Sequence, residues 1–278
     1  MQHLKSFLKP KQKPGNSQLS SVSPQAMPSV PESVFHQPEL GNWYHPVIIS
    51  PTTVGSLATS PTCLHQVIEI VKRLEPDDYV RYLLSYYRTG LERFGELWHY
   101  ADIVTVLLAS TVLIKPMNYL EIGVRRGRSM AMVAAKRTEC NIVGIDMWEN
   151  TNYAGMPNPG PNFVEAELSR LGYKGQLKLI VGDSHQVLPA YFSKHPDLFF
   201  DLITVDGDHS EKGAEQDLRD VVPHLKVGGI LVFDDISHPA HPYLAQVWHD
   251  VIESDACFSS WQYSELGYGV TLAIRKTM

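Results

Sequence analysis

The sequence predicts an α/β domain built on a mostly parallel sheet, with helices on both faces. From about residue 117, short apolar runs alternate with amphipathic segments, an order that gives parallel strands joined by right-handed crossovers. The runs are continuous rather than alternating, as expected for strands buried on both faces. A short glycine-containing turn separates the last two runs, which indicates a hairpin and therefore one antiparallel terminal strand.

The first 60 residues differ from the rest of the chain. Eight prolines recur there among many Ser and Gln residues. Because proline has no N–H donor, long helices and central strands are disfavoured. We expect a largely extended, proline-rich N-terminal arm over residues 1–60.

Residues 61–115 have helical periodicity and are expected to form a helical cap. Apolar residues from Leu64 to Leu74 fall on one helix face. A second helical stretch runs from about Asp77 to Arg93. A third, Leu97–Ile114, is apolar nearly all round, so it should be buried.

Residues 116–278 carry the predicted strands. These are Tyr119–Ile122, Ile142–Ile145, Leu177–Val181, Leu202–Val205, Ile230–Phe233 and the hairpin pair Trp261–Tyr263 and Tyr268–Ile274. Helical patterns lie between the first five, for example over Gly213–Lys226, where the apolar residues share a face. We therefore expect seven strands in this part of the chain.

Composition narrows the class of partner. The net charge is −6 and the pI is near 6.0, which argues against a surface built to bind nucleic acid. No apolar run reaches the length of a membrane span, and the N-terminus has no apolar signal core. The three cysteines are scattered. We expect a small-molecule substrate, no nucleic acid or membrane partner, and a reducing, cytoplasmic setting.

Acidic residues follow all five predicted parallel strands. In an open α/β sheet, ligands bind outside the carboxyl ends of the strands, so these residues should converge. A single acid of this kind is often only a helix cap or a turn former, but five together are informative. The acids and their neighbours are Glu121 with Gly123, Gly127 and Ser129; Asp146 with Met147; Asp183 with Ser184; Asp206 with Asp208 and His209; and Asp234 with Asp235.

The loop after the first strand distinguishes two nucleotide ligands. A dinucleotide site would have G-x-G-x-x-G opening a helix that faces a pyrophosphate. Here Gly123 and Gly127 are spaced G-x-x-x-G, and Glu121 precedes them. A carboxylate would repel phosphate but suits a sulfonium or amino cation. This favours S-adenosylmethionine over NAD, so an NAD-dependent oxidoreductase is the alternative from another class.

These motifs resemble those of class I S-adenosylmethionine-dependent methyltransferases, which have a Rossmann-like seven-stranded sheet. They are most similar to metal-dependent O-methyltransferases related to the catechol enzymes and to those that modify macrolide and aminocoumarin sugars. The similarity covers residues 117–276. It implies cofactor contacts by Glu121, Gly123, Gly127, Ser129, Asp146, Met147, Asp183, Ser184 and Asp206, with Asp146 on the ribose and Asp183 and Ser184 on the adenine.

The resemblance also implies a metal and a base. Asp206, Asp234 and Asp235 would bind one Mg²⁺, since three carboxylates suit a hard cation. His209 is the expected general base and Asp208 its rival. The implied reaction is methyl transfer to a hydroxyl of a small molecule, a sugar or another vicinal diol that can chelate the metal. A metal-independent methyltransferase, a non-catalytic binding module and a metal-dependent hydrolase are alternatives, and the resemblance leaves a homo-oligomer open.

Three further segments carry expectations. His238 and His241 follow the Asp pair, and we expect Pro239 and Pro242 to hold that segment extended as part of the substrate pocket. One of these histidines binding a softer metal is the alternative. Residues 149–163 are expected to form a loop over the substrate entrance, or else a plain crossover. Arg125 and Arg126 are expected to be solvated loop residues.

Overall fold

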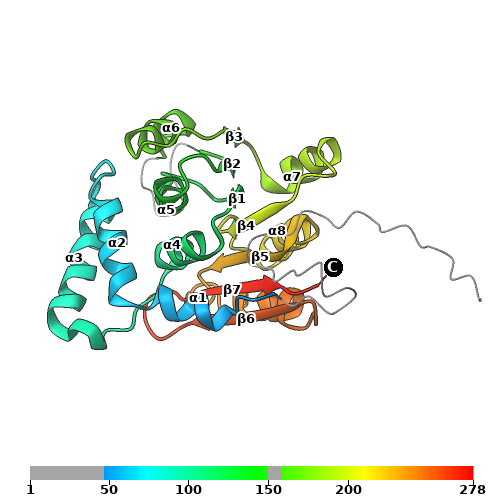
Figure 1. Cartoon of the computed structure of the whole chain (residues 1–278). Coiled ribbons are helices and arrows are strands. Elements are labelled where there is room, and N and C mark those ends of the chain that lie inside the picture. Colours follow the sequence, from blue (N-terminus) through cyan, green and yellow to red (C-terminus); the bar gives the residue numbers. More distant parts are fainter. Residues whose placement is uncertain (1–46, 150–157, 278) are drawn as a thin grey trace, which may run out of the picture.

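The computed structural model describes residues 47–149 and 158–277, in which one seven-stranded sheet runs through the centre of the molecule (Figure 1). The strand order is β3-β2-β1-β4-β5-β7-β6. β1 to β5 are parallel, and β7 is antiparallel to both of its neighbours. The predicted fold class is therefore confirmed. The strands are β1 Asn118–Ile122, β2 Asn141–Asp146, β3 Leu177–Val181, β4 Phe200–Val205, β5 Leu225–Asp234, β6 Phe258–Tyr263 and β7 Val270–Arg275.

Helices cover both faces of the sheet. One core lies between the sheet and α1 to α6, and a second lies between the opposite face and α7 to α9. None of the helices in the described part of the chain is long and apolar enough to cross a bilayer. The helices are α1 Pro51–Ala58, α2 Pro61–Val71, α3 Asp78–Phe94, α4 Ile103–Ile114, α5 Arg128–Lys136, α6 Pro161–Arg170, α7 Ser184–Lys194, α8 Glu211–Val221 and α9 Leu244–Trp248, with single turns at Gly95–Leu97, Val222–His224 and His249–Glu253.

The expectation of a largely extended arm is wrong for residues 51–58, which form α1. Pro51 occupies the first helical position, where its missing N–H is not needed. The Ser50 hydroxyl caps the helix by accepting from the Thr53 N–H at 3.2 Å. α1 packs against α4 and β6, so this segment is part of the domain. Residues 1–46 lie outside the described part of the chain.

Two predicted helix boundaries are also wrong. The buried helix begins at Ile103 rather than at Leu97, because Asp102 forms a capping box with Thr105, each side chain 3.0 Å from the other's backbone N–H. The helix predicted over residues 213–226 ends at Val221, and Leu225 is the first residue of β5.

Candidate functional site

The loop after β1 lies directly against the end of β4. Gly123 has φ of 85°, and its N–H donates to the Ile145 carbonyl oxygen at 2.9 Å. A Cβ at Gly123 would lie 1.8 Å from the Asp206 carbonyl oxygen. Only glycine fits this close approach of two strand ends. Gly127, with φ of 72°, then caps α5 and leaves no room for a Cβ beside Val164.

Glu121 lies beneath this loop, buried within the protein. Its carboxylate accepts hydrogen bonds from the Ser129 hydroxyl and, at 2.6 Å, from the Tyr119 hydroxyl. Burial raises the pKa of Glu121 to about 8, although both hydrogen bonds oppose the shift. The structure thus joins the predicted cofactor residues Glu121 and Ser129 to each other. Their contact with a methyl donor stays a prediction.

Asp146, at the end of β2, ties two loops together. Its carboxylate accepts from the Arg125 N–H at 2.7 Å and from the Trp148 N–H at 2.6 Å. The Trp148 indole N–H in turn donates to the Arg125 carbonyl oxygen at 2.8 Å. Each carboxylate oxygen retains acceptor capacity for a ribose hydroxyl. Met147 is 54% exposed beside this acid, on the surface where the adenine is expected.

Asp183 and Ser184 begin α7 after β3. Asp183 is the helix N-cap, accepting from the His185 N–H at 3.0 Å and from the Gln186 amide at 3.2 Å. Ser184 is buried at the first position of α7, and its hydroxyl opposes the burial that raises the pKa of Asp217 on α8. The Asp183 side chain remains 39% exposed. Both residues therefore have a structural role, and their contact with adenine remains a prediction.

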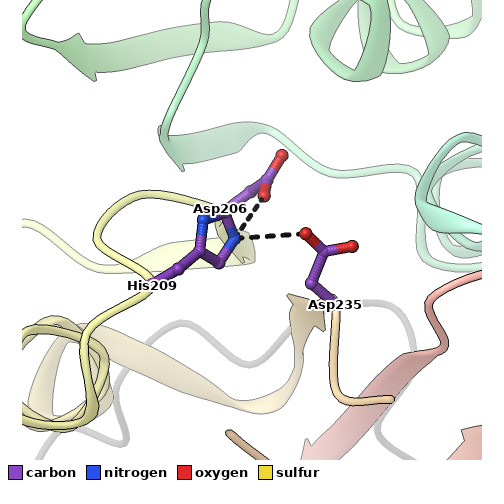
Figure 2. A group of neighbouring side chains, drawn as sticks. All are labelled: Asp206, His209 and Asp235. Atoms are coloured by element: carbon purple, nitrogen blue, oxygen red, sulfur yellow. Dashed lines mark ion pairs between the residues drawn. The ribbon is translucent and has the colours of Figure 1, made fainter. Parts of the chain in front are cut away.

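Three side chains meet at the ends of β4 and β5. Figure 2 shows the His209 imidazole facing the carboxylates of Asp206 and Asp235, with Nε2 3.4 Å from an oxygen of each. Among the described residues, this is the group whose ligand atoms all lie within 4.8 Å of one another. Asp206 and Asp235, which are 29 positions apart, are thus brought together as predicted.

The charges of this group are mutually dependent. Burial and the nearby Asp206 raise the pKa of Asp235 to about 7, while His209 lowers it. Burial alone would lower the pKa of His209, but Asp206 and Asp235 outweigh it and raise the pKa. Two carboxylates that repel each other in a half-buried position would be stabilised by a cation. The donor set therefore fits a divalent metal ion.

Asp234 and Asp208 lie outside this group. Asp234 is the last residue of β5, and burial, with Asp206 and Asp235 nearby, holds its pKa well above the ordinary value. Asp208 is exposed, and its carboxylate accepts from the Ser210 N–H at 2.7 Å, just before α8. The structure places His209, and neither Asp208 nor Asp234, beside Asp206 and Asp235, while the choice between His209 and Asp208 as the base stays a prediction.

The expectation that Arg126 is solvated is wrong. Its side chain is 13% exposed, with Nε 3.0 Å from an Asp77 carboxylate oxygen and the guanidinium 4.3 Å from the Phe163 ring centroid. Arg128, the first residue of α5, has a guanidinium nitrogen 3.9 Å from the other carboxylate oxygen of Asp77. Asp77, the residue before α3, therefore holds the loop from Gly123 to Gly127, here called the glycine loop, in place. Sequence reasoning missed Asp77 because its partner is 49 positions away.

The segment after Asp235 is turned rather than extended, so that expectation is also wrong. The His241 N–H donates to the His238 carbonyl oxygen at 2.9 Å, and the Leu244 N–H to the His241 carbonyl oxygen at 3.1 Å. Pro239 and Pro242 each follow the first residue of a turn, where the fixed φ of proline is favoured. In the loop expected over the substrate entrance, residues 150–157 lie outside the described part of the chain, and Pro161 begins α6.

A parallel sheet with an antiparallel β7, a glycine loop after β1 and an acid at each parallel strand end together define a class I methyltransferase fold. Residues 120–236 match the model of a family described as a methyltransferase domain. The predicted resemblance to S-adenosylmethionine-dependent methyltransferases is therefore confirmed over this part of the chain. A sequence search of curated proteins finds no match.

Solved structures with a similar fold include the O-methyltransferase TomG from Streptomyces achromogenes, in complex with S-adenosylmethionine. It is 18% identical, with 73% of this chain and 92% of that chain covered and a TM-score of 0.50. The calicheamicin methyltransferase CalS11 is 18% identical, with 77% and 91% covered and a TM-score of 0.49. An O-methyltransferase from Bacillus cereus is 13% identical, with 77% and 91% covered and a TM-score of 0.49.

Proposed function

We propose that the protein transfers a methyl group from S-adenosylmethionine to a hydroxyl of a small molecule, a sugar or another vicinal diol, with the help of a divalent metal ion. The observation that carries this proposal is the group of Asp206, His209 and Asp235 beside the glycine loop. Because Gly123 contacts the backbone of Asp206, a donor held on the loop would have its methyl group near these side chains.

In this proposal Asp206 and Asp235 would hold the metal ion, with Asp234 as the third predicted carboxylate and Mg²⁺ as the expected ion. When bound, the ion would lower the pKa of a coordinated hydroxyl and fix its position. A vicinal diol is the favoured acceptor because its two oxygens can chelate one cation.

His209 supplies the base. Its Nε2 takes the hydroxyl proton, and the resulting imidazolium is stabilised by Asp206 and Asp235, each 3.4 Å away. The acceptor oxygen forms a bond to the methyl carbon as the carbon–sulfur bond breaks. The electron pair stays on sulfur, and S-adenosylhomocysteine leaves. The proposed setting is cytoplasmic, where the three cysteines would remain reduced.

The metal is tested by binding. Titration with Mn²⁺, monitored by electron paramagnetic resonance, should show one site in the wild type that Asp206→Asn and Asp235→Asn both weaken. Asp250→Asn is the control, because Asp250 lies in the turn after α9, accepts a hydrogen bond from the Gln246 amide at 2.8 Å and is not part of this group. Mn²⁺ binding unchanged in both site variants, with methylation insensitive to EDTA, would leave a metal-independent methyltransferase.

The base is tested by comparing His209→Ala with Asp208→Asn. Methyl transfer should fall by about 10²–10⁴-fold in the histidine variant and little in the aspartate variant. The reverse order would assign the base to Asp208. A fluorescence titration with NADH addresses the oxidoreductase alternative, because tight binding of that cofactor would contradict a methyl-donor site.

A further inference from the structure

Two successive turns, each with a His-Pro pair at its start, place two imidazole rings beside the group of Asp206, His209 and Asp235, here called the metal group. His238 and His241 are each the first residue of a turn whose second residue is proline. The first turn ends at His241, where the second turn begins, so the chain stays compact between the two histidines. The two rings therefore lie next to each other, with centroids 4.9 Å apart.

These rings form a continuous row, here called the His-Tyr row, of His209, His241, His238 and Tyr268. The ring centroids are 5.4 Å apart between His209 and His241, and 4.1 Å apart between His238 and Tyr268. Tyr268 is 53% exposed, so the row leads from the metal group to solvent. The Ser237 N–H donates to the Tyr268 carbonyl oxygen at 2.6 Å, which fixes the two loops together.

Backbone and hydroxyl contacts determine which nitrogen of each ring carries hydrogen. The Ala240 N–H donates to His238 Nδ1 at 3.1 Å, so the neutral ring has its hydrogen on Nε2. The Tyr243 hydroxyl donates to the His209 carbonyl oxygen at 2.8 Å, so His241 Nδ1, 3.0 Å from that hydroxyl, must be the donor to it. His241 Nε2 is then an acceptor.

We infer that the His-Tyr row binds the methyl acceptor and selects a carbohydrate with a third hydroxyl, in addition to the two that would chelate the metal ion. His238 Nε2 offers a donor and His241 Nε2 an acceptor, and neither bonds to another described residue. A hydroxyl group both donates and accepts, so it matches this pair. The exposed Tyr268 ring at the end of the row offers an apolar face for the C–H groups of the sugar. A flat catechol has no further hydroxyl for these nitrogens.

This inference rests on the proposed function, and paired variants can test it separately. His238→Asn and His241→Asn place an amide where Nδ1 was, so the bonds to Ala240 and Tyr243 are kept and the outer atom is lost. His238→Gln and His241→Gln place the amide where Nε2 was. Initial rates are measured with methyl α-L-rhamnopyranoside, methyl β-D-glucopyranoside and catechol, and binding of S-adenosylhomocysteine is measured by calorimetry on each variant.

The expected result is methylation of a glycoside, with KM raised about tenfold in each Asn variant and substantially restored in the matching Gln variant. Affinity for S-adenosylhomocysteine should not change. Glycoside KM unaffected by the Asn variants, preferential turnover of catechol, or turnover of neither glycoside would overturn the inference. Loss of S-adenosylhomocysteine binding by the wild type would instead refute the proposed function.

Discussion

Replacing Gly123 with alanine tests whether the contact between the ends of β1 and β4 builds the site. The new Cβ would lie 1.8 Å from the Asp206 carbonyl oxygen. A carbon–oxygen contact needs about 3.3 Å, so the two strand ends must separate by about 1.5 Å. Displacements of this size in a catalytic site cost about 100-fold in rate. We therefore expect Gly123→Ala to lose about 100-fold in methyl transfer and to bind S-adenosylhomocysteine more weakly.

Gly172→Ala is the matched control. Gly172 has φ of 87°, close to the 85° of Gly123, but nothing lies within 4 Å of its Cβ position. Both variants suffer the strain of a positive φ, about 1–2 kcal/mol, whereas only Gly123→Ala adds overpacking of about 1–3 kcal/mol. Thermal unfolding and calorimetric titration with S-adenosylhomocysteine measure the two effects. Equal loss of stability in both variants, with wild-type ligand affinity in Gly123→Ala, would refute the reasoning.

Two further predictions concern the surroundings of the loop. Burial raises the pKa of Glu121 from 4.5 to about 8. Between these two pH values the folded protein keeps a proton that the unfolded chain releases. The free energy of unfolding of the wild type should therefore fall as the pH rises from 4.5 to about 8. Glu121→Gln should lose less stability than the wild type between pH 5 and 8.5 in urea titrations, and identical pH dependence would contradict the assignment. Asp77→Ala should destabilise the protein by about 1–3 kcal/mol, because it removes the α3 cap and leaves Arg126 without this ion pair. Asp78→Ala, whose side chain is 97% exposed, should leave the unfolding transition in place, and equal effects would refute a special role for Asp77.

The strands could be predicted closely where a continuous apolar run has clear boundaries. The predicted and observed bounds of β3, Leu177–Val181, are identical. β5 was predicted only from Ile230, whereas it begins at Leu225. Lys226, Gly228 and Gly229 look like strand breakers locally, yet the strand continues across a register shift against β4. Pairing with β4 keeps these residues in a strand despite their low strand propensity, and a local sequence pattern contains no information on that pairing.

The site could be predicted only in part. The rule that parallel strand ends meet at one edge of the sheet correctly placed Asp206 and Asp235 together. It could not decide between adjacent carboxylates. Asp235 has φ of 60°, a left-handed conformation that turns the chain after β5, and it is Asp235 rather than Asp234 that contacts His209. Likewise, the sequence around Arg126 contains no sign of Asp77, because that ion pair exists only once α3 packs on the loop.

The central claim is that the acids at the strand ends surround a positively charged nucleoside. Calorimetric titration of the wild type and Asp146→Ala with S-adenosylhomocysteine tests it most directly. We expect one molecule to bind per wild-type chain, and binding to weaken at least about tenfold in Asp146→Ala, which removes the bonds to Arg125 and Trp148 along with the ribose acceptor. Absence of binding to the folded wild-type protein would contradict the account.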